Sequence, residues 1–252
     1  MRSTLPRIGC VKYLNARPLI HGWPTPVEFD HPSILCHRLA TGELDVALVS
    51  SFEFLRNPIY RIVDLISISS DGPVYSVVIA HRGNISEVDE IELDPASETS
   101  INLLRYLLAE RRLNPRFVAR STSSKAARLL IGDQALRFRQ SHPEHRFWDL
   151  GEEWKNIVDL PFVYALWLVR AEVSDAKSIA DRLRRIRDEN LARIDQVIAQ
   201  EKEFDAEFCR RYYGEHLRFN FGEREKGGLR AFADVCAKQG LIPKRAVEFD
   251  LI

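Results

Sequence analysis

The feature that most constrains the fold is the alternation of short β-branched runs with helical stretches over the first two-thirds of the chain. Residues 45–49 form a nearly continuous apolar run, as expected for a strand buried on both faces. Helices are predicted at residues 33–40, with Ser33 as N-cap, and at residues 100–112. Further strand candidates cover residues 7–11, 62–68, 74–80, 91–94, 116–119, 129–131 and 160–169. This alternation predicts an α/β fold with mostly parallel sheets.

The last third of the chain is predicted to be helical. Residues 175–200 carry an apolar stripe at helical spacing, typical of one long amphipathic helix. Two shorter helices are predicted at residues 205–213 and 223–238. Gly240 fits the C-terminal cap of the last helix.

Two strand-like runs, residues 74–80 and 160–169, are placed as if they cross between two lobes. One lobe would then contain residues 1–78 and 168–252, including the C-terminal helices, and the other residues 79–167. A two-lobed α/β protein binds its ligand in the cleft, near the C-terminal ends of the strands.

Composition and charge exclude several classes of protein. Lysine and arginine number 36, as do aspartate and glutamate, so the formal charge is zero. A nucleic-acid or anionic-membrane partner normally requires a basic excess, so neither is expected. No apolar run of about 18 residues predicts a membrane helix. The N-terminus lacks a secretory signal and the four cysteines form no Cys-x-x-Cys pair, so we expect a cytoplasmic protein with reduced cysteines.

The first candidate site follows the first predicted strand. Tyr13, Asn15 and Arg17 offer an aromatic wall, an amide and a cation that matches a carboxylate. The alternative is a loop in which Asn15 caps a helix and Arg17 is solvated.

Hydroxyl side chains gather at two predicted strand-to-helix turns. Ser50 and Ser51 end the apolar run at 45–49, whereas Ser97, Thr99 and Ser100 precede the predicted helix at 100–112. Hydroxyls beside the free N–H groups of a helix start bind anions well. Plain helix capping is the alternative at both turns.

Two more segments are candidates for the wall of the cleft. Gly132 lets a ligand approach the backbone, and Asp133 either binds it or caps the following helix. Phe162 lies in the aromatic run at 160–167, which suits either a cleft wall or a buried strand. His142 and His145 have no third ligand nearby, and no nucleotide-binding motif is present, so no metal or cofactor is expected.

These residues together predict a cleft rich in hydroxyl, amide and guanidinium groups without a strong candidate base. Such a cleft suits a small carboxylated ligand. Catalysis and simple binding both remain open on this reasoning.

Seven segments in this order resemble the chorismate dehydratase family, which catalyses the first step of the futalosine route to menaquinone. The segments are IGCVKYLNARP at 8–18, GELDVALVS at 42–50, GPVYSV at 72–77, LDPASETS at 93–100, LIGDQA at 130–135, DLGEEW at 149–154 and LPFVYALW at 160–167. The resemblance covers residues 7–170, and the C-terminal third carries no matching motif.

The resemblance implies a type 2 periplasmic-binding-protein fold in a cytosolic enzyme that needs no cofactor. The implied reaction removes water from chorismate and gives 3-[(1-carboxyvinyl)oxy]benzoate. The enolpyruvyl carboxylate of the substrate would itself remove the ring proton, oriented by Asn15 and Ser76. Ser97, Thr99 and Ser100 would bind a carboxylate, assisted by Arg17.

Two alternatives remain beside this reading. The sister enzyme that forms 1,4-dihydroxy-6-naphthoate has a Ser-Pro-Cys-Pro-Asn-like opening, which this chain lacks. A non-catalytic module that binds a small carboxylate would use the same cleft. The oligomeric state is left open, with a homodimer as one option. Lys12 departs from the smaller residue expected at its position.

Overall fold

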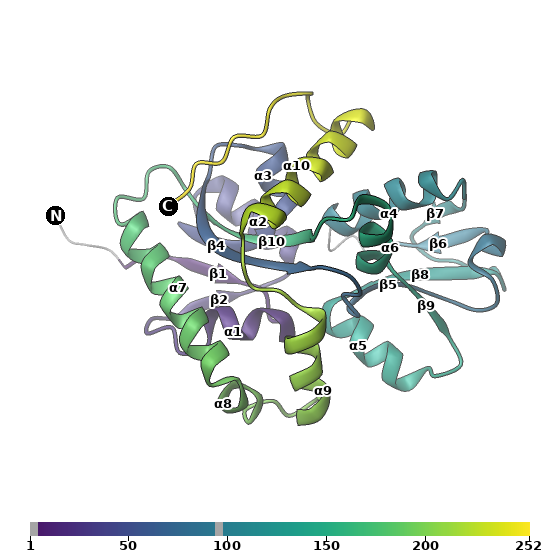
Figure 1. Ribbon diagram of the computed structural model, residues 1–252, viewed down its shortest axis with the longest axis horizontal. Helices are drawn as coiled ribbons and strands as arrows, with labels where there is room; N and C mark the ends of the chain where they lie inside the picture. Colours follow the sequence, from purple (N-terminus) through teal and green to yellow (C-terminus); the bar gives the residue numbers. More distant parts are fainter. Residues whose placement is uncertain (1–4, 94–97) are drawn as a thin grey trace.

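Within residues 5–93 and 98–252, which this computed structural model describes, two five-stranded sheets lie side by side, one in each lobe (Figure 1). The strands are β1 (Ile8–Cys10), β2 (Val27–Phe29), β3 (Val46–Ser50), β4 (Arg61–Ser70), β5 (Val77–His81), β6 (Glu90–Glu92), β7 (Arg116–Val118), β8 (Ala126–Ile131), β9 (Arg146–Asp149) and β10 (Phe162–Val169). The first sheet has the order β2-β1-β3-β10-β4 and the second the order β7-β6-β8-β5-β9. The predicted two-lobed α/β fold is confirmed.

Each sheet combines parallel and antiparallel neighbours. β1 is parallel to β2 and β3, and β6 is parallel to β7 and β8. By contrast, β10 runs antiparallel to β3 and β4, and β5 antiparallel to β8 and β9. The parallel share is therefore smaller than the sequence predicts. The reason is that β10 and β5 enter their sheets from the other lobe, without the same-sheet helical crossover that parallel neighbours need.

The chain passes between the sheets in two short connections. Residues 71–76 join β4 to β5, and residues 159–161 join α6 (Leu150–Val158) to β10. The predicted lobe boundaries, after residues 78 and 167, instead fall inside β5 and β10. A strand pairs its N–H and C=O groups along its length with one sheet, so the change of lobe is easier in a loop. We propose these two connections as the lobe boundaries.

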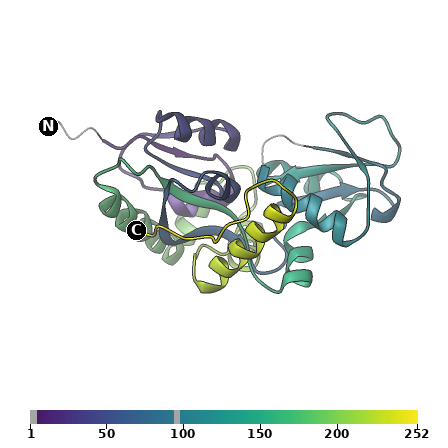
Figure 2. The same ribbon diagram turned by 90° about the horizontal axis from the view of Figure 1, so that it is seen from above.

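Helices cover both lobes (Figures 1 and 2). Besides α6, they are α1 (Arg17–Ile20), α2 (Pro32–Thr41), α3 (Ser51–Arg56), α4 (Glu98–Glu110), α5 (Gly132–Ser141), α7 (Ala176–Ala192), α8 (Ile194–Ile198), α9 (Ala206–Arg211) and α10 (Glu223–Lys238). α2 begins at Pro32 with His31 as N-cap, so the prediction of Ser33 at that position is wrong. Proline suits the first helical position because it has no N–H to satisfy there.

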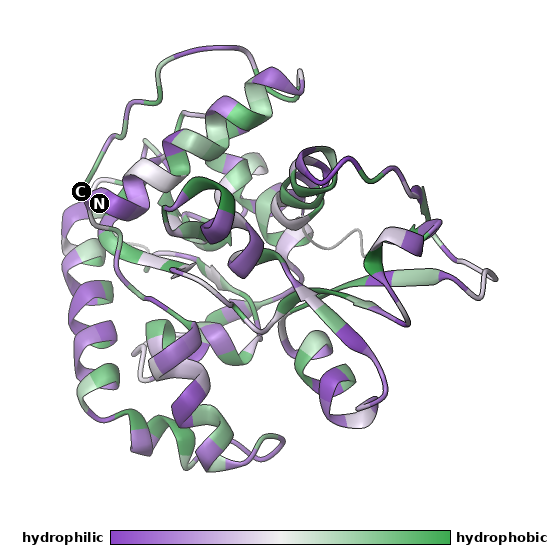
Figure 3. Cartoon of the chain, turned by 45° about the vertical axis from the view of Figure 1, so that its right-hand side comes forward, coloured by the Kyte–Doolittle hydropathy of each residue, from purple (hydrophilic) through white to green (hydrophobic). Residues whose placement is uncertain are grey.

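The C-terminal third packs mainly on the first sheet. α10 has the predicted bounds and lies against β10, and Gly240 follows it with a left-handed φ of 71°. The stripe at residues 175–200 divides into α7 and α8 at Arg193, whose φ of −126° and ψ of 40° are not helical. α7 packs on α1 and β4 and leaves hydrophilic residues along its outer side (Figure 3).

The core is continuous from the first sheet to α6 of the second lobe. Trp154 of α6 is fully buried, and its ring meets Phe162 of β10 at 5.1 Å and Phe232 of α10 at 6.2 Å between centroids. The four cysteines are buried and unpaired. Across the described ranges, 5–93 and 98–252, no helix has both the length and the apolar surface needed to cross a membrane.

Candidate functional site

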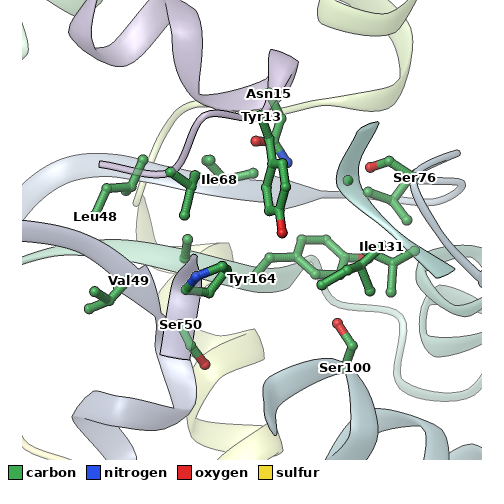
Figure 4. Close-up of a pocket in the computed structure, with 16 residues that line it drawn as sticks. Tyr13, Asn15, Leu48, Val49, Ser50, Ile68, Ser76, Ser100, Ile131 and Tyr164 are labelled. Carbon is green, nitrogen blue, oxygen red and sulfur yellow. The ribbon is translucent and has the colours of Figure 1, made fainter. Parts of the chain in front are cut away.

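A cavity of about 70 Å³ lies between the lobes (Figure 4). Asn15 and Tyr13 approach it from one side, Ser76 from a second and Ser100 from below. Its lining comes from the ends of β1, β3 and β8, the connection before β5, the start of α4 and the middle of β10. The lining residues are Val11, Tyr13, Asn15, Pro32, Leu48, Val49, Ser50, Ile68, Val74, Ser76, Val77, Ser100, Ile131, Gly132, Tyr164 and Ala165.

Asn15 is held by the backbone of its neighbour Leu14, in a short 3₁₀ turn at Leu14–Ala16. The Leu14 N–H donates to Asp133 Oδ1 of the other lobe at 2.8 Å, and the Leu14 carbonyl accepts from the Tyr213 hydroxyl at 2.9 Å. The side-chain oxygen of Asn15 is buried and has no hydrogen-bond partner among the described residues. A buried unpaired acceptor is costly, so this oxygen is available for a ligand hydrogen.

Ser76 stands at the end of the first connection between lobes, which Asp149 holds in place. The carboxylate of Asp149 accepts from the N–H groups of Val74 at 3.0 Å and Tyr75 at 2.7 Å. Tyr75 has a left-handed φ of 67°, a conformation that is strained for a tyrosine. Ser76 is 1% exposed, and its hydroxyl accepts from the Tyr212 hydroxyl at 2.7 Å.

Tyr13 reaches across the cavity to the second lobe. A Cβ atom on Gly132 would lie 2.9 Å from Cγ of the Tyr13 ring, and Gly132 has a left-handed φ of 54°. Glycine is therefore required here both by the backbone conformation and by the approach of Tyr13. The contact closes one side of the cavity.

The predicted hydroxyl residues divide into two groups. Ser50 and Ser100 line the cavity. Thr99 instead bonds Ser50 and accepts from the Phe52 N–H at 3.2 Å, which joins α4 to α3 across the lobes. Ser51 donates to the Val163 carbonyl at 2.7 Å and is fully buried. Ser97 lies outside the described residues.

Three other predicted binding residues lie away from the cavity wall. One carboxylate oxygen of Asp133 accepts a hydrogen bond from the Leu14 N–H. Arg17 pairs with Glu201 and lines a separate surface groove with Lys12 and Trp23. Phe162 belongs to the core around Trp154. The contacts of these three residues support the fold around the cavity, and their predicted contacts with a ligand stay a prediction.

Among the described lining residues, none carries a charge at neutral pH. The ionisable groups on the wall are the phenols of Tyr13 and Tyr164, and burial raises the pKa of Tyr164 well above its ordinary value. The cavity thus offers neutral hydrogen-bond donors and acceptors on an apolar, aromatic wall. Such a site can orient a polar ligand and stabilise developing charge, but its own wall supplies no strong base.

The raised pKa of Asp133 predicts how the stability of the folded protein changes with pH. Burial raises this pKa from 3.8 to about 6, so the folded state holds the proton more tightly than the unfolded chain does. The contribution of Asp133 to stability is therefore greatest below pH 4 and is lost as the pH rises through 6. Asparagine keeps the oxygen that accepts from Leu14, so Asp133→Asn should be more stable than the parent by about 1–3 kcal/mol at pH 7.

Denaturant unfolding at pH 4 and pH 7 measures this effect. We expect the gap between the two variants to be small or reversed at pH 4 and to open at pH 7. A gap that does not change with pH would contradict the raised pKa.

Sequence comparison identifies the group of proteins that shares these features. A sequence model described as menaquinone biosynthesis matches residues 6–238. The chain belongs to the menaquinone biosynthesis family. Within it, the chain is 30% identical over 253 aligned positions to the chorismate dehydratase of Thermus thermophilus, covering 90% of this chain and 93% of that protein.

Solved structures with the same fold include binding proteins. This family member matches a crystal structure of a protein from Archaeoglobus fulgidus with a TM-score of 0.73 at 18% identity, covering 96% of this chain and all of that one. It also matches the alkanesulfonate-binding protein SsuA of Xanthomonas axonopodis pv. citri, solved with MOPS bound, with a TM-score of 0.67 at 15% identity, covering 96% and 95% of the two chains. The predicted periplasmic-binding-protein fold is confirmed.

Two residues of the site, Tyr164 and Tyr212, were not predicted from the sequence of this family member. Tyr164 lies in the aromatic run from which Phe162 was selected, and a register shift between Val163 and Ala165 marks a bulge in β10. A bulge redirects a side chain, so Tyr164 faces the cavity while Phe162 faces the core. Tyr212 lies in the C-terminal third, where no motif singles it out, and the sequence offers no signal for it.

Proposed function

We propose that this protein is a chorismate dehydratase, which removes water from chorismate to give 3-[(1-carboxyvinyl)oxy]benzoate. The observation that carries the proposal is the cavity between the lobes that Asn15 and Ser76 both line, with no charged group on the described wall. The likeness to the Thermus thermophilus enzyme supports it. Chorismate carries a carboxylate that can act as the base, which suits a cavity whose described wall has no strong base.

The reaction balances without a protein base or a cofactor. The C–H bond breaks at the ring carbon that bears the enolpyruvyl ether, and its electron pair forms the new ring double bond. The C–O bond at the neighbouring ring carbon breaks, and hydroxide leaves with the electron pair of that C–O bond. The enolpyruvyl carboxylate accepts the ring proton and passes it to the hydroxide, so that water is released. Aromatisation of the ring drives the elimination.

The protein would contribute mainly positioning and hydrogen bonding. Asn15 and Ser76 would orient the reacting groups, in keeping with their places on the cavity wall. At the opposite end, Ser50 and Ser100 lie beside the N-terminus of α4, where the helix dipole favours a carboxylate. Holding the substrate in a reactive pose can account for a large share of catalysis.

The experiment is to incubate the purified protein with chorismate, without added metal or cofactor and with a chelator present. Mass spectrometry should find a product lighter than chorismate by one water. Chorismate that stays unchanged in the presence of folded protein would refute the proposal. Binding without turnover would favour a non-catalytic module, an alternative that the shared fold with SsuA keeps open.

A further inference from the structure

Tyr212 is a buried residue with a polar contact to the cavity that the reaction scheme above does not use. It begins the short π-helical turn Tyr212–His216 after α9. Single π-helical turns occur often at functional sites. The side chain is fully buried, and its ring stacks on Phe208 with 5.7 Å between centroids. Its hydroxyl donates to Ser76 Oγ at 2.7 Å, although 136 positions separate the two residues in the sequence.

The hydrogen bond from this hydroxyl has a defined direction. A phenol has a single hydrogen, and Tyr212 donates it to Ser76 Oγ. On the same cavity wall, Asn15 Oδ1 is buried and has no hydrogen-bond partner among the described residues.

This direction determines what Ser76 can do. A serine hydroxyl has one hydrogen and two lone pairs, and Tyr212 occupies one of those lone pairs. The hydrogen of Ser76 is then left to point into the cavity, and a hydroxyl that accepts one bond becomes a better donor in the next. Burial raises the pKa of Tyr212, so the phenol stays protonated at neutral pH and keeps its hydrogen for Ser76.

We propose that Tyr212 is a positioning residue that orients the Ser76 hydroxyl as a hydrogen-bond donor to the departing hydroxyl group of the substrate. This inference rests on the proposed function. Asn15 Oδ1, the unpaired acceptor beside it, would take the hydrogen of the same hydroxyl group. Tyr212 forms and breaks no covalent bond and keeps its proton throughout.

Removal of the phenol oxygen tests this role. Tyr212→Phe keeps the ring and its packing on Phe208 but leaves Ser76 free to rotate. We expect kcat to fall about tenfold, with little change in KM, because the lost bond acts on the departing group rather than on substrate binding. Tyr60→Phe is the matched control, since Tyr60 is also buried but its hydroxyl faces Glu53, away from the cavity.

A double-mutant cycle separates positioning from general stability. If Tyr212 acts only through Ser76, then Tyr212→Phe should have no further effect on kcat in a Ser76→Ala background. The inference would be overturned if Tyr212→Phe lowered kcat by the same factor in the Ser76→Ala background as in the wild type. A Tyr212→Phe enzyme with normal kcat would also overturn it. Wild-type protein that fails to dehydrate chorismate would refute the proposed function instead.

A second variant keeps the test decisive if Tyr212→Phe does not fold. A 3-fluorotyrosine at position 212 retains the ring and hydroxyl but gives up its proton at lower pH than tyrosine. A more acidic phenol donates a stronger hydrogen bond, so we expect kcat of that variant at neutral pH to exceed that of the wild type. A kcat equal to or below the wild-type value would contradict a donor role for Tyr212.

Discussion

Asn15→Ala is expected to lower kcat by about 10²- to 10³-fold while chorismate still binds. Among the described lining residues, Asn15 has a buried side-chain oxygen without a hydrogen-bond partner. Its loss would remove the acceptor that we propose for the departing hydroxyl group. The carboxylates of the substrate would keep their contacts at the start of α4, so KM should change much less than kcat.

Steady-state kinetics and calorimetric titration with the product separate these two effects. Asn84→Ala is a suitable control, because Asn84 caps a surface turn at Ile85–Glu87 and lies outside the cavity. An Asn15→Ala protein that binds normally and turns over at the wild-type rate would remove Asn15 from the mechanism.

Gly132→Ala should impair both stability and turnover. A methyl group would lie 2.9 Å from Cγ of Tyr13. Rotation of the ring about its own axis does not move Cγ and cannot relieve this contact. We therefore expect that the two lobes could not close on each other. The left-handed φ of 54° adds strain of about 1 kcal/mol for any residue with a Cβ. We expect kcat/KM to fall about 10- to 100-fold, because the reactive pose depends on closure.

Gly83→Ala is the matched control for the backbone strain. Gly83 also has a left-handed φ, of 68°, but a Cβ there would meet nothing within 4 Å. Thermal unfolding should show a similar strain cost in both variants, whereas only Gly132→Ala should lose activity. Equal activities in the two variants would mean that the Tyr13 contact does not govern closure.

Much of the fold could be predicted because it depends on local patterns. The apolar run at 45–49 became β3, and the capped amphipathic segment at 223–238 became α10 with the same bounds. Asn15 and Ser76 could be placed at one cavity because both follow or precede strands whose ends meet between the lobes. In each case the signal lies within a few residues of the feature that it predicts.

Contacts between distant parts of the chain decided the rest. Phe162 and Tyr164 are two positions apart and would face the same side of a regular strand, but with the bulge in β10 Tyr164 lines the cavity while Phe162 packs on Trp154. Asp133 and Thr99 have the chemistry of ligand contacts, yet their polar atoms are used to join the lobes. Arg17 forms an ion pair with Glu201, which is far away in the sequence.

The amino-acid sequence alone determined the two-lobed α/β fold, the neutral composition and the presence of an amide and hydroxyl groups at strand ends, because periodicity and turn chemistry are local properties of the chain. Only the tertiary structure decided which of those polar groups face the cavity and that Tyr212 completes the site. A hydrogen bond between residues 136 positions apart depends on how the lobes and the C-terminal helices pack, and no short segment encodes that packing.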